Sequence, residues 1–534
     1  VLGLTEGRIR VIKPRIGGGF GGKQEVFLEG LCAALTLKTG CPLRMALSRE
    51  EEFIHSRTRH PQVIRLRTGV RRNGDIAAMD MNVLMNTGAY GSQGLTVMCN
   101  TGSKTLPLYR CGNVSFNGDV VYTNLPVGGA YRGYGATQGY VAMGIQMDEM
   151  AVAIGMDPLE FHKRNHIRAG EGSPIFQALG EGKEGVKMVL DTCGLDECIE
   201  RGAQWIGWTR KRGRPGKGPV KRGIGMVCLM QGSSIPEVDM GAASIKINED
   251  GSFNLLIGAT DLGTGSDTVL AQIAAEVLGV PLEKIIVYSS DTDMTPFDVG
   301  AYASSTTYLS GNAVRKAAFK VKEQILSVAS GMMSVPADKI LLENSEAKGP
   351  DKSIPLSRIA AYTMYEHEQF QIMASASHIS RKSPPPFSAH FAEVLVDTET
   401  GMVRVIRYVA AVDCGTAINP RLAEGQTEGA VLNGISFALT EEYLFNGQGR
   451  MLNPTFTHYK IFSTRDLPEV KTILVSGYEP TGPFGAKSVS EISINGPIPA
   501  ISNAIYDAVG IRLRKTPFTP DRVLTALKKK HLKQ

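Results

Sequence analysis

The sequence has few cysteines, no long hydrophobic run and little net charge. Its eight cysteines are scattered among 534 residues, too few and too far apart for a disulfide framework, so a reducing compartment suits the chain. Glycines or charged residues interrupt every apolar run before the roughly 18 residues that a membrane span requires. The first ten residues, VLGLTEGRIR, lack the charged start and apolar stretch of a signal peptide. We therefore expect a cytoplasmic protein with no membrane partner.

The charge of the chain gives little support for nucleic-acid binding. The net charge is +6 at pH 7, which is small for 534 residues. Part of the basic excess lies at residues 210–222 and part in the tail at 528–530. We interpret the first stretch as a linker between two large parts of the chain and the second as a solvated tail. The sequence thus predicts no nucleic-acid partner.

Patterns that bind a metal ion directly are also missing. Cys193 and Cys198 have the C-x4-C spacing that opens a plant-type iron–sulfur site, but the required C-x2-C does not follow. None of the nine histidines belongs to an H-E-x-x-H motif or pairs with cysteines at zinc-finger spacing. A metal bound here would therefore have to bring its own ligands.

Glycine, with 60 residues, exceeds its usual share of about 7% and is concentrated in three loops. The loops at 17–22 and 258–265 each follow an extended segment and precede a helical pattern and a second extended segment, which suggests an internal duplication. The loop at 128–135 leads into a stripe of methionines, which we interpret as core. The predicted strands are 8–16, 42–47, 253–257, 284–288, 392–397 and 403–412, and the predicted helices lie around 28–35, 143–154, 158–165, 270–277 and 501–508.

These elements predict an α+β fold. Because strands and helices alternate on both sides of the basic linker, we expect two large mixed α/β halves, residues 1–215 and 216–534.

The loop at residues 17–23 satisfies two generic nucleotide-binding patterns, and neither is decisive. A nucleoside-triphosphate loop needs serine or threonine after its lysine, and here Gln24 follows Lys23. A dinucleotide fold needs an acidic residue where this helix is only just ending, and Phe20 would crowd the pyrophosphate. Glycine loops still let backbone N–H groups approach an anionic ligand. Three such loops suit one extended polar ligand, unless they are only tight turns between packed elements.

Seven motifs lie in order along nearly the whole chain. They are GGGFGGKQE at 17–25, AYRGYGATQ at 130–138, GATDLGTG at 258–265, AYASSTTYLSGNAV at 301–314, VDCGTAINP at 412–420, QTEGAVLNG at 426–434 and GAKSVSEISINGPIPAISNAI at 485–505. Together they resemble the molybdenum-binding part of the xanthine dehydrogenase/aldehyde oxidase family of molybdenum hydroxylases. The residues of these motifs are most similar to those of bacterial purine hydroxylases of the selenium-dependent type.

The resemblance implies a molybdenum ion held by the dithiolene of a molybdopterin between the two halves, with no protein atom as a direct metal ligand. The nucleotide form of the pterin, a cytosine dinucleotide among the choices, stays open, as does a sulfido or selenido ligand. Phe20, Arg132 and Ala303 are implied to lie near the metal, and Thr264 stands where many relatives have glutamine. The implied cofactor-binding residues are Gly19, Phe20, Gly21, Arg132, Gly263, Thr264, Gly265, Ala303, Ser304, Ser305 and Gln426.

The same resemblance implies water-derived hydroxylation of an electron-poor carbon, with Glu491 as the catalytic base. A carboxylate held close to the metal and away from bulk water can take the proton that this reaction releases. The implied substrate-contacting residues are Gln24, Gly91, Tyr134, Ser233 and Ser234.

The substrate positions depart from the pattern of xanthine-oxidising relatives. Those relatives have a glutamate in place of Gln24, an arginine in place of Gly91 and a second aromatic ring in place of Ser233. Gln24 can still donate and accept hydrogen bonds to a heteroaromatic ring. We therefore place hydroxylation of a purine-like N-heteroaromatic compound above aldehyde oxidation.

The chain has no iron–sulfur cysteine pattern and no convincing flavin or nicotinamide loop, yet two electrons must leave the metal. The resemblance therefore implies a partner subunit or domain with a [2Fe-2S] cluster, and a flavin (FAD) subunit. Relatives carry earlier molybdenum-domain sequence upstream, so we expect a split subunit or the C-terminal part of a longer polypeptide. A non-catalytic homologue without the metal is the rival of another class. A serine hydrolase lacks support, because no G-x-S-x-G motif occurs.

Overall fold

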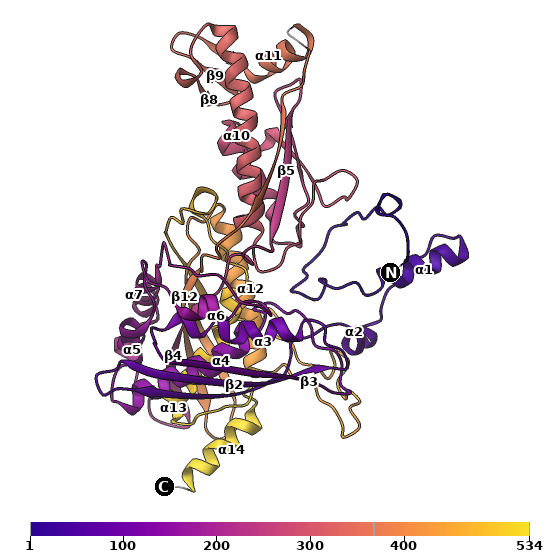
Figure 1. Ribbon diagram of the computed structural model, residues 1–534. Helices are drawn as coiled ribbons and strands as arrows, with labels where there is room; N and C mark the ends of the chain where they lie inside the picture. The colour runs from indigo at the N-terminus through magenta and orange to yellow at the C-terminus, as the bar shows by residue number, and fades with distance from the viewer. Residues whose placement is uncertain (1, 367–368, 533–534) are drawn as a thin grey trace.

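The computed structural model describes residues 2–366 and 369–532, which form a broad lower body and an upper arm in the view of Figure 1. Two sheets lie in the lower body, and the arm is built along the long helix α10 (Thr306–Met333). Helices and mixed sheets occur on both sides of residue 215, which confirms the predicted α+β fold.

The first sheet has the strand order β1-β2-β3. Strands β1 and β2 run antiparallel, whereas β2 and β3 run parallel. Two helices, α3 and α4, pack on this sheet, and Met143 and Met147 of α4 are completely buried, so the methionine stripe is core, as predicted. The elements are β1 (Gln62–Val70), β2 (Ile76–Gly88), α3 (Gly94–Ser103), β3 (Val114–Tyr122) and α4 (Ala136–Ala153).

The second sheet has the order β14-β13-β12-β4 and carries a helix layer on each face. A Cβ at Gly225 of β4 would lie 2.3 Å from the Ala500 carbonyl oxygen, so α13 packs directly on the backbone of this strand. Gly202 of α7 packs in the same close way on Phe391 of β12. Gly225 is paired with Ala392, and successive residues of a strand face opposite sides, so α13 and α7 cover opposite faces. The elements are α7 (Leu195–Ile206), β4 (Val220–Met230), β12 (Phe387–Asp397), β13 (Val403–Asp413), α12 (Pro420–Leu439), β14 (Glu469–Val475) and α13 (Pro497–Val509).

Helix α7 precedes residue 215, but it packs on strands that follow it. The two predicted halves therefore share one hydrophobic core, which runs from Ile76 to Leu527. The boundary at residue 215 falls in the turn between α8 and β4 and stays a prediction.

The arm has its own core, formed by residues between Ala243 and Ile372. Its sheet, β11-β5-β6-β7, packs against α9 and α10, and a small sheet, β10-β9-β8, lies near the far end of α10 (Figure 1). The predicted strand, loop, helix and strand around the third motif are confirmed. The elements are β5 (Met240–Ile247), β6 (Phe253–Ile257), α9 (Ser266–Leu278), β7 (Ile285–Ser289), β8 (Leu341–Glu343), β9 (Glu346–Lys348), β10 (Ser353–Pro355), α11 (Leu356–Ala361) and β11 (Met373–Ile379).

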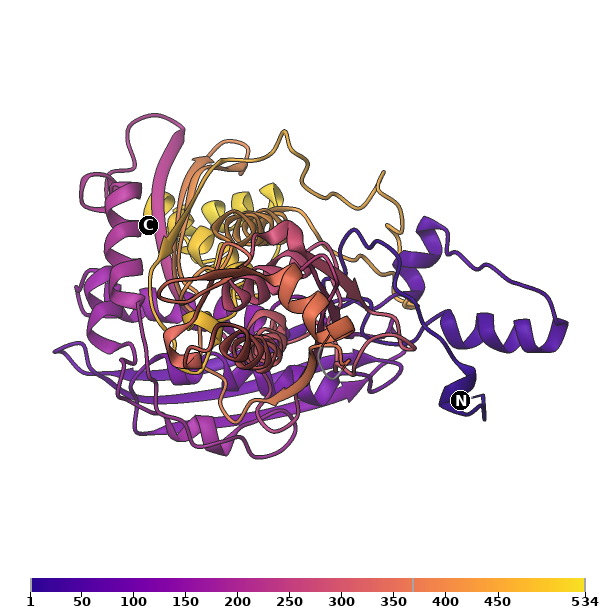
Figure 2. The ribbon, with the colours of Figure 1, turned by 90° about the horizontal axis from the view of Figure 1, so that it is seen from above.

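The N-terminal segment departs from the prediction. Helix α1 (Glu29–Thr39) forms and ends at Gly40, but the predicted strands at 8–16 and 42–47 do not. A strand needs a hydrogen-bonded neighbour, and within the described residues the first segment has only an isolated bridge from Ile12 to Asp291. None of the side chains of α1 is buried, and the helix projects away from the body in Figures 1 and 2. The proposed internal duplication therefore fails at the level of its strands.

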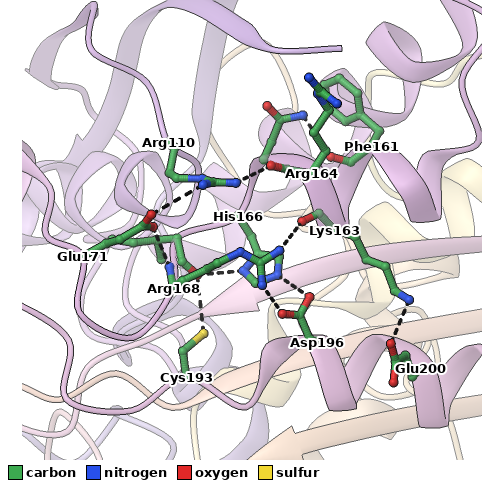
Figure 3. A network of polar contacts seen from close by, with 12 residues as sticks. Arg110, Phe161, Lys163, Arg164, His166, Arg168, Glu171, Cys193, Asp196 and Glu200 are labelled. Carbon is green, nitrogen blue, oxygen red and sulfur yellow. Dashed lines mark hydrogen bonds and ion pairs between the residues drawn. The ribbon is translucent and has the colours of Figure 1, made fainter. Parts of the chain in front are cut away.

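Polar contacts lock α5 (Pro158–Asn165) onto α7 (Figure 3). Asp196 of α7 accepts a hydrogen bond from His166 Nε2 at 2.8 Å and pairs with Arg168. Arg168 also donates from Nη2 to the Lys163 carbonyl oxygen at 2.7 Å. These bonds fix the turn after α5 against the second sheet's helix layer. The remaining helices are α2 (Arg49–His55), α6 (Pro174–Ala178), α8 (Trp208–Lys211) and α14 (Pro520–His531).

Candidate active site

The three glycine loops line one cavity of about 890 Å³. Segments from both sides of residue 215 line it. The predicted residues among its lining are Gly19, Phe20, Gly21, Gln24, Arg132, Tyr134, Ser234, Gly263, Thr264, Ala303, Ser304, Gln426 and Glu491.

The first glycine loop touches both of the others. The Arg132 amide donates to the Phe20 carbonyl oxygen at 2.9 Å. Gly21 has φ +100, and a Cβ there would lie 2.6 Å from the Ala130 carbonyl oxygen. On the other side, a Cβ at Gly263 would lie 3.4 Å from the Ile16 carbonyl oxygen. Only glycine satisfies both the positive φ and the close approach at residue 21, so the contact between the two loops requires glycine at this position.

Glu491 lines the same cavity and is bonded from two different loops. Its Oε1 accepts from the Gly133 amide at 3.0 Å, and its Oε2 accepts from Ser304 Oγ at 2.8 Å. Gly133 belongs to the loop before α4 and Ser304 to the loop before α10. Each carboxylate oxygen keeps a free lone pair, because an ionised carboxylate has about four acceptor sites. The side chain is therefore held in one orientation while it remains able to accept a proton.

Arg132 is a buried cation beside Glu491. Its Nε donates to the Ser490 carbonyl oxygen at 2.5 Å, and its Nη2 donates to the Gln426 carbonyl oxygen at 2.9 Å. Its guanidinium carbon lies 5.8 Å from the centre of the Phe20 ring. Burial lowers the pKa of Arg132 to about 10, although the Glu491 charge opposes that shift. Arg132 thus joins the chain segment that carries Glu491 to the glycine loop around Phe20.

Non-glycine residues with left-handed backbone angles gather around the cavity. Phe20 has φ 50, Tyr134 has φ 41, Ala303 has φ 50 and Ser304 has φ 55. Each such residue costs on the order of 1–3 kcal/mol, and strain of this kind concentrates at functional sites. All four belong to motifs that the sequence analysis singled out, so the strain supports a functional cavity.

The loop at 261–265 satisfies its own amides. Asp261 Oδ1 accepts from the amides of Gly263, Thr264 and Gly265 at 2.8, 3.0 and 3.2 Å, and Oδ2 accepts from the Asp267 amide at 3.2 Å. Burial alone would raise the pKa of Asp261, but the four backbone donors together outweigh that effect. The pKa of Asp261 therefore lies below its ordinary value. Because the amides of Gly263, Thr264 and Gly265 are already bonded to Asp261, any cofactor contact from these residues would use the Thr264 side chain or a carbonyl group.

Four predicted site residues lie outside the cavity lining. Ser233 is fully buried, donates to the Pro384 carbonyl oxygen at 2.6 Å and accepts from the Ser488 amide, so its hydroxyl faces protein. Gly91 lies under the Tyr122 hydroxyl. Gly265 and Ser305 directly precede α9 and α10, where they begin helices. The contacts predicted for these four residues were assigned from motif position alone.

Sequence reasoning missed a polar face of α3 that lines the cavity. Tyr134 Oη lies 2.6 Å from Thr96 Oγ1 and also donates to Gln93 Oε1. Asn100 and Lys104 continue the same face at helical spacing. Polar residues at positions 93, 96, 100 and 104, spaced three to four apart, were the available signal. Other lining residues that were missed are Glu181, Gln231, Ile235, Val299 and Tyr302.

The cavity is compatible with an anionic pterin cofactor. Within the described part of the chain, the amides of Gly18, Gly19 and Gly21 donate to no protein acceptor. Free amides at a glycine loop are the donors that a phosphate or a pterin oxygen requires.

The described residues contain no group of three or more His, Cys, Asp or Glu side chains placed to hold a metal ion. They also contain no helix that combines the length and the apolar character needed to span a bilayer.

Comparison with known families assigns the class of the fold. Residues 1–166 and residues 199–468 each match a model of the molybdopterin cofactor-binding domain. The chain therefore binds a molybdopterin cofactor and belongs to the molybdopterin-dependent oxidoreductases of the xanthine dehydrogenase/aldehyde oxidoreductase family. The resemblance drawn from the seven motifs is confirmed.

Curated relatives support the same family. The chain is 39% identical over 532 residues to "Probable hypoxanthine oxidase XdhD" of Escherichia coli (strain K12), with 99% of this chain and 55% of that protein covered. It is 37% identical over 528 residues to the xanthine dehydrogenase molybdenum-binding subunit of Escherichia coli O157:H7, with 96% and 69% covered. The chain thus spans just over half of XdhD. The crystal structure of quinoline 2-oxidoreductase from Pseudomonas putida 86 has the same fold, with a TM-score of 0.89, 24% identity, and 97% of this chain and 69% of that chain covered.

Proposed function

We propose that this chain is the molybdenum-binding part of an enzyme that hydroxylates a purine-like N-heteroaromatic compound with oxygen derived from water. The observation that carries the proposal is the position of Glu491, which is bonded to Gly133 and Ser304 at the point where the loops of both predicted halves meet. The names of two relatives, a hypoxanthine oxidase and a xanthine dehydrogenase subunit, favour a purine over an aldehyde.

The proposed cofactor contacts come from the glycine loops and from Arg132. The free amides of Gly19 and Gly21 and the lining residues Ala303 and Gln426 would hold the molybdopterin. When bound, the molybdenum cofactor supplies the redox centre that accepts two electrons from the substrate. Its nucleotide form, with a cytosine dinucleotide among the choices, can be read from the mass of the extracted cofactor.

The residues of this chain prepare the site for proton transfer. Glu491 accepts the proton released during hydroxylation at whichever carboxylate oxygen faces the cavity, since Gly133 and Ser304 each occupy only one lone pair. The buried Arg132 guanidinium donates to the Ser490 carbonyl oxygen and so holds the segment that carries Glu491 in place. Gln24 and Tyr134 line the same cavity and would hold the substrate ring through an amide hydrogen bond and a ring face.

Electrons would leave through a partner. We propose a partner subunit or domain with a [2Fe-2S] cluster and a flavin-bearing one beyond it, because a relative of this chain is named as the molybdenum-binding subunit of a xanthine dehydrogenase. Eight free cysteines, with several buried, suit a complex that works in the reducing cytoplasm. The partner proposal predicts that an iron–sulfur polypeptide co-purifies with this chain.

The decisive test is Glu491→Gln in the purified complex. Loss of a general base lowers turnover by about 10²- to 10⁴-fold, so we expect that loss with unchanged molybdenum content and unchanged visible spectrum. Glu442→Gln is the matched control, because Glu442 pairs with Arg522 outside the cavity. Retained turnover at full cofactor loading would remove Glu491 from the mechanism.

A substrate screen separates the remaining candidates. Purines, pyridines and aromatic aldehydes are offered to the complex with a dye as electron acceptor. Turnover confined to aldehydes would favour an aldehyde oxidoreductase of the same family. A chain that takes up no molybdenum in its native host would instead be a non-catalytic homologue.

A further inference from the structure

The cavity has two different ends. One end adjoins a hollow of about 100 Å³ with which it shares Thr264, Ala301, Ser304, Gln426 and Ser490. The other end adjoins a second hollow of about 100 Å³ with which it shares Lys104, Glu181, Gln231, Gly232, Ser234 and Ile235. Because Ser304 bonds Glu491, the proposed catalytic carboxylate belongs toward the first end. The second end is therefore the part of the cavity left for substrate.

Two opposite charges stand at the second end without a protein partner. Lys104 follows the last residue of α3, and its backbone is fixed because Tyr140 Oη donates to the Lys104 carbonyl oxygen at 2.8 Å. Its ammonium extends along Gly232, where a Cβ would lie 3.1 Å from Nζ. Glu181 comes from the separate loop between α6 and α7. Across the described residues, neither the Lys104 ammonium nor the Glu181 carboxylate forms a hydrogen bond or an ion pair.

The charge of Glu181 reaches the cavity. Tyr302, which lines the cavity, has a pKa raised to about 12, chiefly by burial, with Asp239 and Glu181 adding to that shift. Tyr134 has a raised pKa for the same main reason, again with a contribution from Glu181. Glu181 therefore lies close to two rings that face the substrate space. Lys104 and Glu181 are both partly exposed, so their charged groups are available to a ligand that occupies the cavity.

Lys104 and Glu181 line the same end of the cavity, so they present a cation and a carboxylate to a molecular edge that has one acceptor and one donor. A lactam, in which a ring carbonyl is next to a ring N–H, is such an edge, and oxopurines carry it. An aldehyde has an acceptor and no N–H donor. Resting on the proposed function, we infer that Lys104 and Glu181 are specificity-determining residues for an oxopurine, with Lys104 donating to its carbonyl oxygen and Glu181 accepting from its ring N–H.

The test compares an oxopurine with substrates that lack its lactam edge. We expect Lys104→Met and Glu181→Gln each to lower kcat/KM for hypoxanthine by about 10- to 100-fold, mainly through KM, since a hydrogen bond to a charged group is lost. Purine, which lacks the carbonyl, should lose little in Lys104→Met. An aromatic aldehyde should lose little in either variant.

Matched controls come from the outer hollow. Lys183 and Glu184 line that hollow without reaching the cavity, so Lys183→Met and Glu184→Gln should leave hypoxanthine kinetics unchanged. Lys104→Arg should restore much of the lost kcat/KM, because it keeps a cationic donor. Molybdenum content verifies that each variant is loaded.

A binding measurement separates this inference from the proposed function. Hypoxanthine affinity is measured by calorimetry on the Glu491→Gln complex, alone and with either substitution. Weaker binding in both combined variants supports the inference even if the wild-type complex fails to oxidise purines, which would refute only the proposed function. Equal affinity in all three complexes, or a loss that is the same for hypoxanthine and the aldehyde, overturns the inference.

Discussion

The buried ion pair between Lys487 and Asp413 allows a quantitative prediction about the segment that carries Glu491. Lys487 Nζ lies 2.7 Å from Asp413 Oδ2, and the two side chains are 0% and 2% exposed. Lys487→Met leaves the carboxylate buried without its counter-ion, and breaking a buried pair in this way costs about 3–5 kcal/mol. Asp413 keeps the amides of Gly194 and Gly415 as donors, so we expect the lower end, about 3 kcal/mol.

A double-mutant cycle isolates the pair. Asp413→Asn should also destabilise the protein, because the Lys487 ammonium then faces a neutral amide. In the combined variant neither charge is left unpaired, so its loss should be smaller than the sum of the single losses by about 2 kcal/mol. Urea unfolding followed by tryptophan fluorescence measures these differences, since Trp208 belongs to the core that Lys487 contacts through Phe387 and Trp205 packs against that core.

An exposed pair provides the control. Lys348 Nζ lies 2.8 Å from Glu343 Oε2, but these side chains are 36% and 55% exposed, so Lys348→Met should cost less than about 1 kcal/mol. Single losses that add within about 0.5 kcal/mol would refute the coupling. A Lys487→Met variant as stable as the control would refute the argument from burial.

Two further predictions concern the cofactor loops. Gly21→Ala should lower the unfolding free energy by about 1–3 kcal/mol and reduce molybdenum content, because residue 21 has φ +100 and its new Cβ would lie 2.6 Å from the Ala130 carbonyl oxygen. Gly17→Ala is the control, because its new Cβ meets no atom within 4 Å. It should match the wild type in both thermal unfolding and elemental analysis. Asp261→Ala should destabilise the protein at neutral pH by about 1–3 kcal/mol, since four amides lose their acceptor. The pKa of Asp261 is lowered in the fold, so its contribution is present above the unfolded value near 4 and is lost as pH falls through the folded value. The unfolding temperatures of the wild type and of Asp261→Ala should therefore become equal in acid. A difference in unfolding temperature that stays constant to low pH would contradict the role of the ionised Asp261 carboxylate as acceptor for these amides.

Local sequence patterns predicted the helices, because the backbone hydrogen bonds of a helix join residues that are close in the chain. Helices α4, α9 and α13 follow from apolar residues at helical spacing and from glycine at the ends of α9 and α13. The strands expected at 8–16 and 42–47 fail for the opposite reason. Their composition suits extended chain, but a strand also needs a neighbour, and sequence does not reveal whether one lies alongside.

The candidate site divides in the same way. The motif residues Phe20, Arg132 and Glu491 could be named from the sequence because each sits at a fixed place within a distinctive motif. The prediction for Ser233 came from motif position, which says nothing of the Pro384 carbonyl group that accepts its hydroxyl. Lys104 was overlooked because it looks like any surface lysine.

By itself, the sequence determined the family and the glycine loops, and it predicted the carboxylate at position 491, since these depend on short runs of residues whose backbone and chemistry are local. Only the tertiary structure decided which of those runs share a cavity. Gly133 and Ser304 bond the same carboxylate although 171 positions separate them, and Lys104 and Glu181 meet one hollow from different elements. Contacts of this kind arise from the packing of sheets and helices over long stretches of chain, and no local pattern encodes them.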